Sequence, residues 1–282
     1  MRLRRRHIAT MLTFALVLAV TAVVVLPFYW AVSLSLRNPR EAFTVTGLAV
    51  PFVQYQPTLA NWRTELATGE TQQALVNSSI IALGTAVVVV VLGTPAAYAL
   101  ARFRFRRPSN EDITIWFLSQ RVLPPVVTAI PLLLLIRWLG LFDTRTGLVL
   151  ANATFTLPLV VVIMRQAFLD LPVELEEAAM VDGAGHLHIF LRIFLPLASP
   201  SLVAAVLIVI AFTWNEFLFA LMMYFVNAKV IPVHMAGAMD TRGVQFWFVA
   251  VRALIAITPP VILALLVQRY IVRGLTFGAV KG

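Results

Sequence analysis

Residues 170–198 read DLPVELEEAAMVDGAGHLHIFLRIFLPLA, a polar, glycine-containing segment between two long apolar runs. It carries five of the chain's 13 acidic residues: Asp170, Glu174, Glu176, Glu177 and Asp182. The flanking runs have the length and composition that a bilayer-spanning helix needs. We therefore expect a polar loop outside the membrane, joining two membrane-spanning helices.

The composition of the whole chain points to the same class of protein. Of its 282 residues, 60% are hydrophobic and only 12% are charged, about half the charged share of a soluble domain. Cysteine is absent, which excludes a disulfide framework, cysteine nucleophiles and thiolate metal sites. The net charge of +9 lies beside apolar runs, so it indicates membrane topology, and we expect no nucleic-acid partner.

About six apolar runs are long enough to cross a bilayer, which takes roughly 20 residues. We predict an all-α polytopic helix bundle that forms a single transmembrane domain over residues 1–282, with a loop over 170–198 and a C-terminal tail over 272–282. The six predicted spans lie near residues 8–35, 74–100, 113–136, 147–169, 198–225 and 246–271.

The arginine clusters predict the orientation of the spans. Arg2, Arg4, Arg5 and Arg6 precede span one, and a second cluster lies at 102–107. Because cytoplasmic loops are enriched in basic residues, both termini and the 170–198 loop are expected in the cytoplasm. A signal peptide is the alternative for the first run, but the run is too long and continues through an aromatic cluster rather than a cleavage site.

Local sequence predicts two short helices within the loop. Leu171-Pro172 suits a helix start, Ala178 and Ala179 favour helix, and Gly183 and Gly185 can end it. An apolar face follows, made by Ile189, Phe190, Ile193 and Phe194, and Pro196 closes it. Such a loop suits docking into a groove of another protein; the alternative is an amphipathic loop lying on the membrane.

The complete pattern is Glu177-Ala178-Ala179, three residues, Gly183, nine residues, then Ile193-Phe194-Leu195-Pro196. It resembles the signature of bacterial ABC importer permeases, in particular the sugar-importer branch that includes the second maltose-transporter permease. Further stretches are similar in order and spacing: Ala97 to Phe103, Leu139 to Thr144, Leu171-Pro172, Trp214 to Phe217, and Gly274 to Gly282.

The resemblance implies a function and a set of partners. The chain would be the non-catalytic permease subunit of a binding-protein-dependent, ATP-driven importer of a sugar, polyol or glycoside in a bacterial inner membrane. It would pair with a second homologous permease, two copies of a cytoplasmic ATPase and an extracytoplasmic solute-binding protein. ATP and Mg would bind to the ATPase, since this chain lacks a phosphate loop, and no cofactor is expected here. The predicted ATPase-coupling residues are Glu177, Ala178, Ala179, Asp182 and Gly183, and the predicted tail contacts are Gly278 and Lys281.

Polar residues inside predicted spans are candidates for a solute pathway, because they are costly there. The candidates are Gln120, Asn152, Trp214, Asn215, Glu216 and Gln245; hydrogen bonding between helices is the alternative role. An Arg121–Glu216 ion pair is rejected because the two residues lie at different predicted depths, and Arg121 is expected to snorkel inward. Pro124-Pro125 and Pro259-Pro260 are expected to break or kink spans three and six.

Two other classes of protein are considered. An ion-coupled secondary transporter would call for buried carboxylates and inverted repeats, and it would leave the 170–198 loop unexplained. A membrane enzyme is disfavoured because no catalytic or metal-binding constellation is recognisable, and His186 and His188 have no metal-ligand neighbours. The external loop near 37–73, with Asn61-Trp62, is interpreted as interfacial or as a contact for an external partner.

Overall fold

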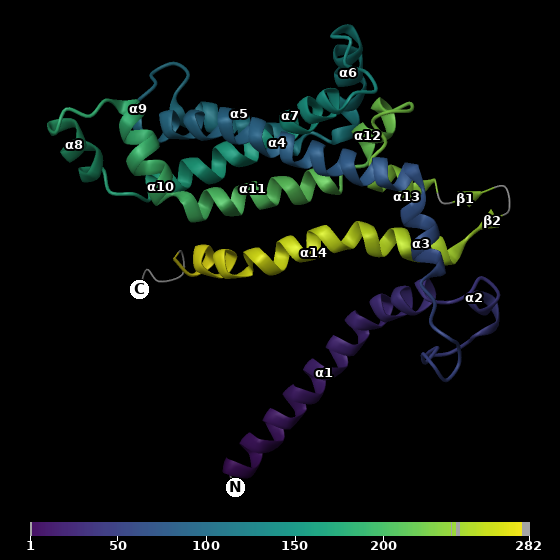
Figure 1. Ribbon diagram of the computed structural model, residues 1–282. Helices are drawn as coiled ribbons and strands as arrows, with labels where there is room; N and C mark the ends of the chain where they lie inside the picture. The colour runs from purple at the N-terminus through teal and green to yellow at the C-terminus, as the bar shows by residue number, and fades with distance from the viewer. Residues whose placement is uncertain (1, 238, 241–242, 278–282) are drawn as a thin grey trace. The chain divides into compact units, whose positions relative to one another are not determined.

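The computed structural model describes residues 2–237, 239–240 and 243–277 (Figure 1). The regular secondary structure of the described residues is helical except for one two-stranded ribbon. In this ribbon β1 (Met239–Asp240) pairs antiparallel with β2 (Gly243–Val244). The predicted all-α helix bundle is therefore confirmed. Contacts divide the chain into two units, one taking in the described residues of Met1–Gln72 and Met235–Thr258, the other those of Gln73–His234 and Pro259–Gly282. The single transmembrane domain stays a prediction.

The first unit begins with α1 (Arg2–Ser35) and contains α2 (Glu41–Thr44), α3 (Ala60–Ala67) and the first part of α14 (Phe246–Phe277). The loop after α1 is folded back onto the end of that helix. Asn61 is buried and donates to the carbonyls of Ser35 and Arg37, while Trp62 Nε1 donates to Ser35 Oγ at 3.1 Å. The loop is thus a packed cap on α1 as well as a candidate interfacial segment.

The second unit is built around α7 (Arg145–Leu169), which packs against α5 (Asn110–Val122), α6 (Pro125–Trp138), α11 (Ser199–Trp214) and α12 (Leu218–Met223). The remaining helices are α4 (Gly69–Arg102), α8 (Glu174–Val181), α9 (His186–Ile189), the π-helical turn η1 (Phe190–Phe194), α10 (Leu195–Leu197) and α13 (Ile231–Ala236).

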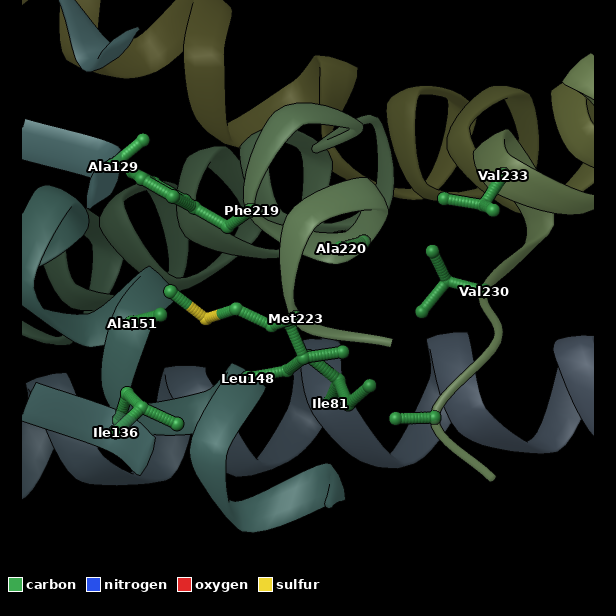
Figure 2. Packing of buried hydrophobic residues seen from close by; sticks show 11 residues of the cluster. Ile81, Ala129, Ile136, Leu148, Ala151, Phe219, Ala220, Met223, Val230 and Val233 are labelled. Carbon is green, nitrogen blue, oxygen red and sulfur yellow. The ribbon is translucent and has the colours of Figure 1, made fainter. Parts of the chain in front are cut away.

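Small and branched apolar side chains fill the core of this unit (Figure 2). Met223 and Phe219 of α12 lie among Ile81 of α4, Ile136 of α6 and Leu148 of α7, and all five are at most 2% exposed. Burial of such side chains stabilises the fold by about 1.5–3 kcal/mol each relative to exposure. This core holds α12 in place, and α12 follows directly after residues 215–217.

Among the residues that the structure describes, four helices are long and apolar enough to cross a membrane, and the number rises to six if two bent pairs each count as one span. The four are Thr10–Ser35, Gly69–Arg102, Arg145–Leu169 and Phe246–Leu266. The prediction of about six spans is met only with the bent pairs, and two predicted spans are not continuous helices.

The predicted span over 113–136 is broken. α5 and α6 meet at an angle of 97°, with Leu123 extended at φ −65° and ψ 127°. The residue before a proline is driven out of the helical region by the proline ring, so Leu123 cannot continue the helix into Pro124-Pro125. The sequence-based expectation of a break is confirmed here. At Pro259-Pro260, by contrast, α14 is uninterrupted.

The predicted span over 198–225 was wrong as a single helix. α11 ends at Trp214, residues 215–217 are not helical, and α12 starts at Leu218. The Glu216 carboxylate accepts from the backbone N–H groups of Phe219 (2.8 Å) and Ala220 (3.1 Å). It therefore accepts hydrogen bonds from N–H groups that the start of a new helix leaves unpaired. This reduces the free-energy cost of a helix break in apolar surroundings.

Candidate functional site

The polar loop forms the short helix α8, which ends in a tight turn at Gly183. Gly183 N–H donates to Met180 O at 3.0 Å, and Ala184 N–H donates to Ala179 O at 2.9 Å. This pair of bonds is the Schellman arrangement, which needs a residue with positive φ; Gly183 has φ +83°. The predicted helix end is confirmed, while α8 begins at Glu174, two residues later than Pro172.

The predicted coupling residues lie together on and after α8. Glu177, Ala178, Asp182 and Gly183 are exposed, and Ala179 is half-buried. Beside them is an open hollow of about 490 Å³, lined by Ala179, Asp182, Gly183, Ala184, Gly185, His188 and Ile193. An exposed helix of small and acidic residues beside a hollow can seat against a basic, grooved partner.

The other side of the loop is fastened into the bundle. Ile189, Phe190 and Phe194 are buried, and Ile193 is partly buried, as the apolar face predicted. The chain widens to a π-helical turn over Phe190–Phe194, a feature that is frequent at functional sites. Helix α10 ends at Leu197, one residue beyond the predicted stop at Pro196. The helical segment from α9 to α10 (His186–Leu197) makes a bend of 77° with α11.

A second candidate site is a cavity of about 590 Å³ where the two helix breaks meet. Its lining includes Pro124 and Pro125 from the break between α5 and α6, and Asn215 to Phe217 from the break between α11 and α12. Breaks in membrane helices expose backbone groups, and they are tolerated where the backbone is buried in protein or lines a cavity. The remaining lining residues are Arg121, Val126, Asn152, Phe155, Thr156, Phe212, Leu218 and Phe219.

The polar groups of this cavity are partly engaged and partly left for a ligand. The side-chain amides of Asn152 and Asn215 donate to the carbonyls four residues earlier, Leu148 O and Ala211 O. Their amide oxygens accept no hydrogen bond from the described residues, and each oxygen can accept two. Arg121 Nη1 donates to Phe155 O at 3.2 Å, and its guanidinium lies 5.1 Å from the centroid of the Phe212 ring. The cavity therefore offers a cation, amide acceptors and aromatic faces.

The structure brings together only part of the predicted pathway set. Asn152, Asn215 and Glu216 line the cavity, whereas Trp214, which is 5% exposed, and Gln120 do not. Gln245 belongs to the first unit, where it lines a smaller pocket of about 250 Å³. Among the described residues, no ion pair joins Arg121 to Glu216; Arg121 instead lines the same cavity, a role that the snorkelling interpretation missed.

The sequence predicted no specific role for two other polar residues. Asp143 accepts hydrogen bonds from the backbone at 225–228, and Glu176 is buried although its neighbours Leu175 and Glu177 are exposed. Only their hydrogen-bonding partners, which are distant in the sequence, distinguish them from ordinary loop carboxylates. In the described part of the chain, no group of three or more His, Cys, Asp or Glu residues could hold a metal ion. Gly278 and Lys281 of the predicted tail lie outside the described residues.

Comparison with known proteins settles the family. Residues 89–277 match the family described as "Binding-protein-dependent transport system inner membrane component". The chain belongs to this family. The family membership confirms the resemblance seen in the sequence, identifies a multi-pass membrane component of an ABC importer, and does not favour an ion-coupled secondary transporter.

Similar proteins extend over nearly the whole chain. The chain is 37% identical to the trehalose transport system permease protein SugB of Mycobacterium tuberculosis, over 91% of this chain and 92% of that protein. It is 35% identical to the trehalose/maltose transport system permease protein MalG of Thermococcus litoralis, over 91% of each. A solved bacterial ABC transporter involved in the import of alginate, an acidic polysaccharide, superposes with a TM-score of 0.79 at 22% identity, over 95% of this chain and 98% of that one, which supports the fold.

Proposed function

We propose that this permease carries a sugar or a sugar-like polyol or glycoside into the bacterial cytoplasm, using ATP hydrolysed by a separate subunit. The observation that supports this most directly is helix α8. It presents Glu177 and Ala178 to solvent and ends in a tight, exposed turn at Gly183. The relatives named for trehalose and maltose transport supply the class of solute.

In this proposal the exposed residues of the loop seat on the ATPase. Ala179, Asp182 and Gly183 line the hollow, and Glu177 and Ala178 are exposed on the helix before it. The segment is small enough for close approach and acidic enough to meet basic groups. ATP and Mg would bind to the two ATPase copies, since the sequence of this chain has no phosphate-loop motif. Gly278 and Lys281 of the tail are proposed to contact the same partner.

The cavity at the two helix breaks is the proposed stretch of solute pathway in this subunit. A sugar hydroxyl both donates and accepts hydrogen bonds, so it can accept from Arg121 and donate to the oxygens of Asn152 and Asn215. The rings of Phe155 and Phe212 offer apolar faces for the C–H face of a pyranose. A second homologous permease would complete the pathway, and an external binding protein would deliver the solute.

Orientation follows from charge. With the arginines at 102–107 and the α8 loop on one side, the positive-inside rule places the α8 loop and both termini in the cytoplasm. The cap on α1 and the loop around Asp143 would then face outward. Cysteines introduced at Val181 and Phe52, both strongly exposed, would report this with an impermeant maleimide in intact cells. Labelling of Phe52→Cys alone is expected, and labelling of Val181→Cys would contradict it.

The function is tested in proteoliposomes that hold the complete complex of this chain with its partner permease and ATPase. Radiolabelled trehalose and maltose are presented with the binding protein outside. We expect uptake that requires internal hydrolysable ATP and survives proton and sodium ionophores. Uptake that ionophores abolish and that proceeds without ATP would contradict an ATP-driven importer.

The cavity is tested in the same system by Asn215→Ala, with Thr154→Ala as the matched control. Thr154 is exposed on α7 and bonds only to Leu150 O in its own helix. Loss of one hydrogen bond to a solute is expected to raise the KM for uptake by roughly tenfold. Equal effects of the two substitutions would argue against the cavity.

A further inference from the structure

The three glutamates of α8 do not share one environment. Glu174 and Glu177 are exposed, whereas Glu176 is 6% exposed and is the buried residue of α8. A carboxylate is buried only where it is paired, because its desolvation is costly. The partners of Glu176 therefore show what this residue does.

Two of those partners lie on α4, about 75 residues earlier in the chain, and a third is His186 of α9, whose Nδ1 lies 3.6 Å from Glu176 Oε1. Tyr98 Oη donates to Glu176 Oε1 at 2.9 Å, and Arg102 Nε lies 3.5 Å from Glu176 Oε2. Both are near the C-terminal end of α4, and the side chains of Arg102 and Glu176 are 8% and 7% exposed. One carboxylate thus joins α8 to the end of a membrane-spanning helix.

Arg102 extends the connection to the end of α7, to the segment before α8 and to the η1 turn. Its Nη2 donates to Phe168 O and Leu171 O, both at 2.8 Å, and its guanidinium lies 4.5 Å from the centroid of the Phe194 ring. The Tyr98 ring contacts four other rings, those of Phe103, Phe168, Phe190 and Phe194. The ends of α4 and α7 and the η1 turn therefore meet α8 at one buried point.

The segments on both sides of α8 are non-helical, so the backbone alone does not fix the orientation of α8 relative to α4 and α7. Residues 170–173 before α8 are not helical, and Gly183 to Gly185 after it form a glycine turn. Hinges of this kind absorb changes in φ and ψ. The contacts of Glu176 with Tyr98 and Arg102 tie α8 to α4 independently of those hinges, and its contact with His186 ties α8 to α9.

We propose that Glu176, Tyr98 and Arg102 form a clasp that makes α8 and the end of α4 move as one body. The clasp converts a displacement of α8 by the ATPase into a displacement of α4. Separation of Glu176 from Arg102 would leave an uncompensated buried charge. When the ATPase displaces α8, a shared movement of α8 and α4 therefore costs less free energy than separation of the pair. Glu176, Tyr98 and Arg102 are thus positioning residues of the coupling step. This inference rests on the proposed seating of α8 against an ATPase.

The first test measures whether the two helices move together, and it needs no solute. The chain contains no cysteine, so V181C on α8 and F105C, three residues after α4, supply its two spin-label sites. Val181 is 88% exposed and Phe105 is 45% exposed. Asn110 holds the segment after α4, since its amide donates to Leu100 O and Phe103 O. Distances are measured in the full complex, with partner cysteines replaced, before and after trapping with ATP and vanadate.

We expect the same narrow distance distribution before and after trapping in the parent protein and in the exposed control E174Q. In E176A, the distribution is expected to broaden or shift on trapping. A distribution that changes on trapping in the parent protein, or one that stays narrow in E176A, would overturn the proposal.

The second test separates coupling from assembly, using Y98F and E176Q singly and together. Y98F keeps the ring among its four neighbours and removes only the hydroxyl. We expect the ATPase to copurify with all three variants, and trehalose uptake per ATP hydrolysed to fall roughly tenfold in each single variant. In this proposal the Tyr98 hydroxyl acts through Glu176, so the double variant is expected to fall no further than E176Q.

Two results would contradict the clasp: loss of the ATPase from purified Y98F, which would indicate a purely structural role, or multiplication of the two single effects in the double variant. Absence of trehalose uptake by the parent complex would instead overturn the proposed class of solute, while the distance measurement would still judge the clasp.

Discussion

Asp143 holds Asn227 across 84 positions of sequence. Both carboxylate oxygens of Asp143 accept from the Asn227 backbone N–H at 3.0 Å, and Oδ2 also accepts from its side-chain amide at 2.9 Å. The backbone N–H groups of Phe225, Val226 and Ala228 donate to the same carboxylate at 2.9–3.1 Å. The turn before α7 is thereby joined to the chain that follows α12.

Replacement of Asp143 by Asn is expected to destabilise the permease by about 1–3 kcal/mol, because a neutral amide offers one acceptor oxygen where the carboxylate offers two. Asn tolerates the φ of +57° at this position, so backbone strain does not contribute. The midpoint of thermal unfolding in detergent measures the change. Asp170→Asn, which removes a single exposed contact with Gln166, is the control and is expected to stay near the parent value.

The same carboxylate predicts a dependence of stability on pH. Partial burial alone would raise the pKa of Asp143, but the N–H donors at 225–228 outweigh it and lower the pKa to about 2. A lowered pKa in the folded state contributes stability above the ordinary value near 4, and this contribution is lost as the pH falls from 4 towards 2. The gap in unfolding midpoint between the parent and Asp143→Asn should therefore be constant from pH 7 to 5 and narrow below pH 4. A gap that widens on acidification would contradict this.

Gly183→Ala tests the turn after α8. A Cβ at Gly183 meets nothing within 4 Å, so the expected cost of about 1–2 kcal/mol comes from its φ of +83° alone. Gly185→Ala is the matched control, since Gly185 also has open space and its φ is −78°. We expect less ATPase to copurify with Gly183→Ala than with Gly185→Ala. Equal yields would show that the turn does not shape the docking surface.

Charge reversal at Glu177 tests the docking face. Glu177 and Glu174 are both exposed on α8, so Lys at either position leaves the packing intact. If Glu177 meets a basic group of the ATPase, Glu177→Lys should lower the amount of copurified ATPase by roughly tenfold or more. Glu174→Lys, one turn earlier on the same face, should lower it less, and the opposite ranking would move the docking contact towards the N-terminal end of α8.

Gly147→Ala tests a close approach in the bundle. A Cβ at Gly147 would clash with the backbone carbonyl oxygen of Leu141 and lie 3.1 Å from a methyl carbon of Ile136. The backbone carbonyl cannot rotate away as a side chain can, so α7 would have to shift, at a cost of about 1–3 kcal/mol. Gly69→Ala is the control because nothing lies within 4 Å of its Cβ position. An unfolding midpoint for Gly147→Ala equal to that of Gly69→Ala would contradict the packing described here.

Much of the fold was accessible from sequence because it depends on local properties. The long apolar runs predict the helices at 69–102 and 145–169 to within a few residues at most ends, and Gly183 and Pro124 mark a turn and a break through their own backbone preferences. The break at 215–217 was missed. The run around it is apolar, and the break depends on Glu216 bonding to N–H groups three and four residues later.

The sequence by itself determined that the chain is a helical membrane protein with an exposed loop ending in a glycine turn, since composition, helix length and the φ of glycine need no distant partner. Only the tertiary structure decided what the polar residues do. Glu177 and Glu176 are adjacent carboxylates in the sequence, yet one faces solvent and the other meets Tyr98 on α4. Helix geometry turns neighbours to different sides, and the energy of a buried charge depends on the groups that packing places beside it.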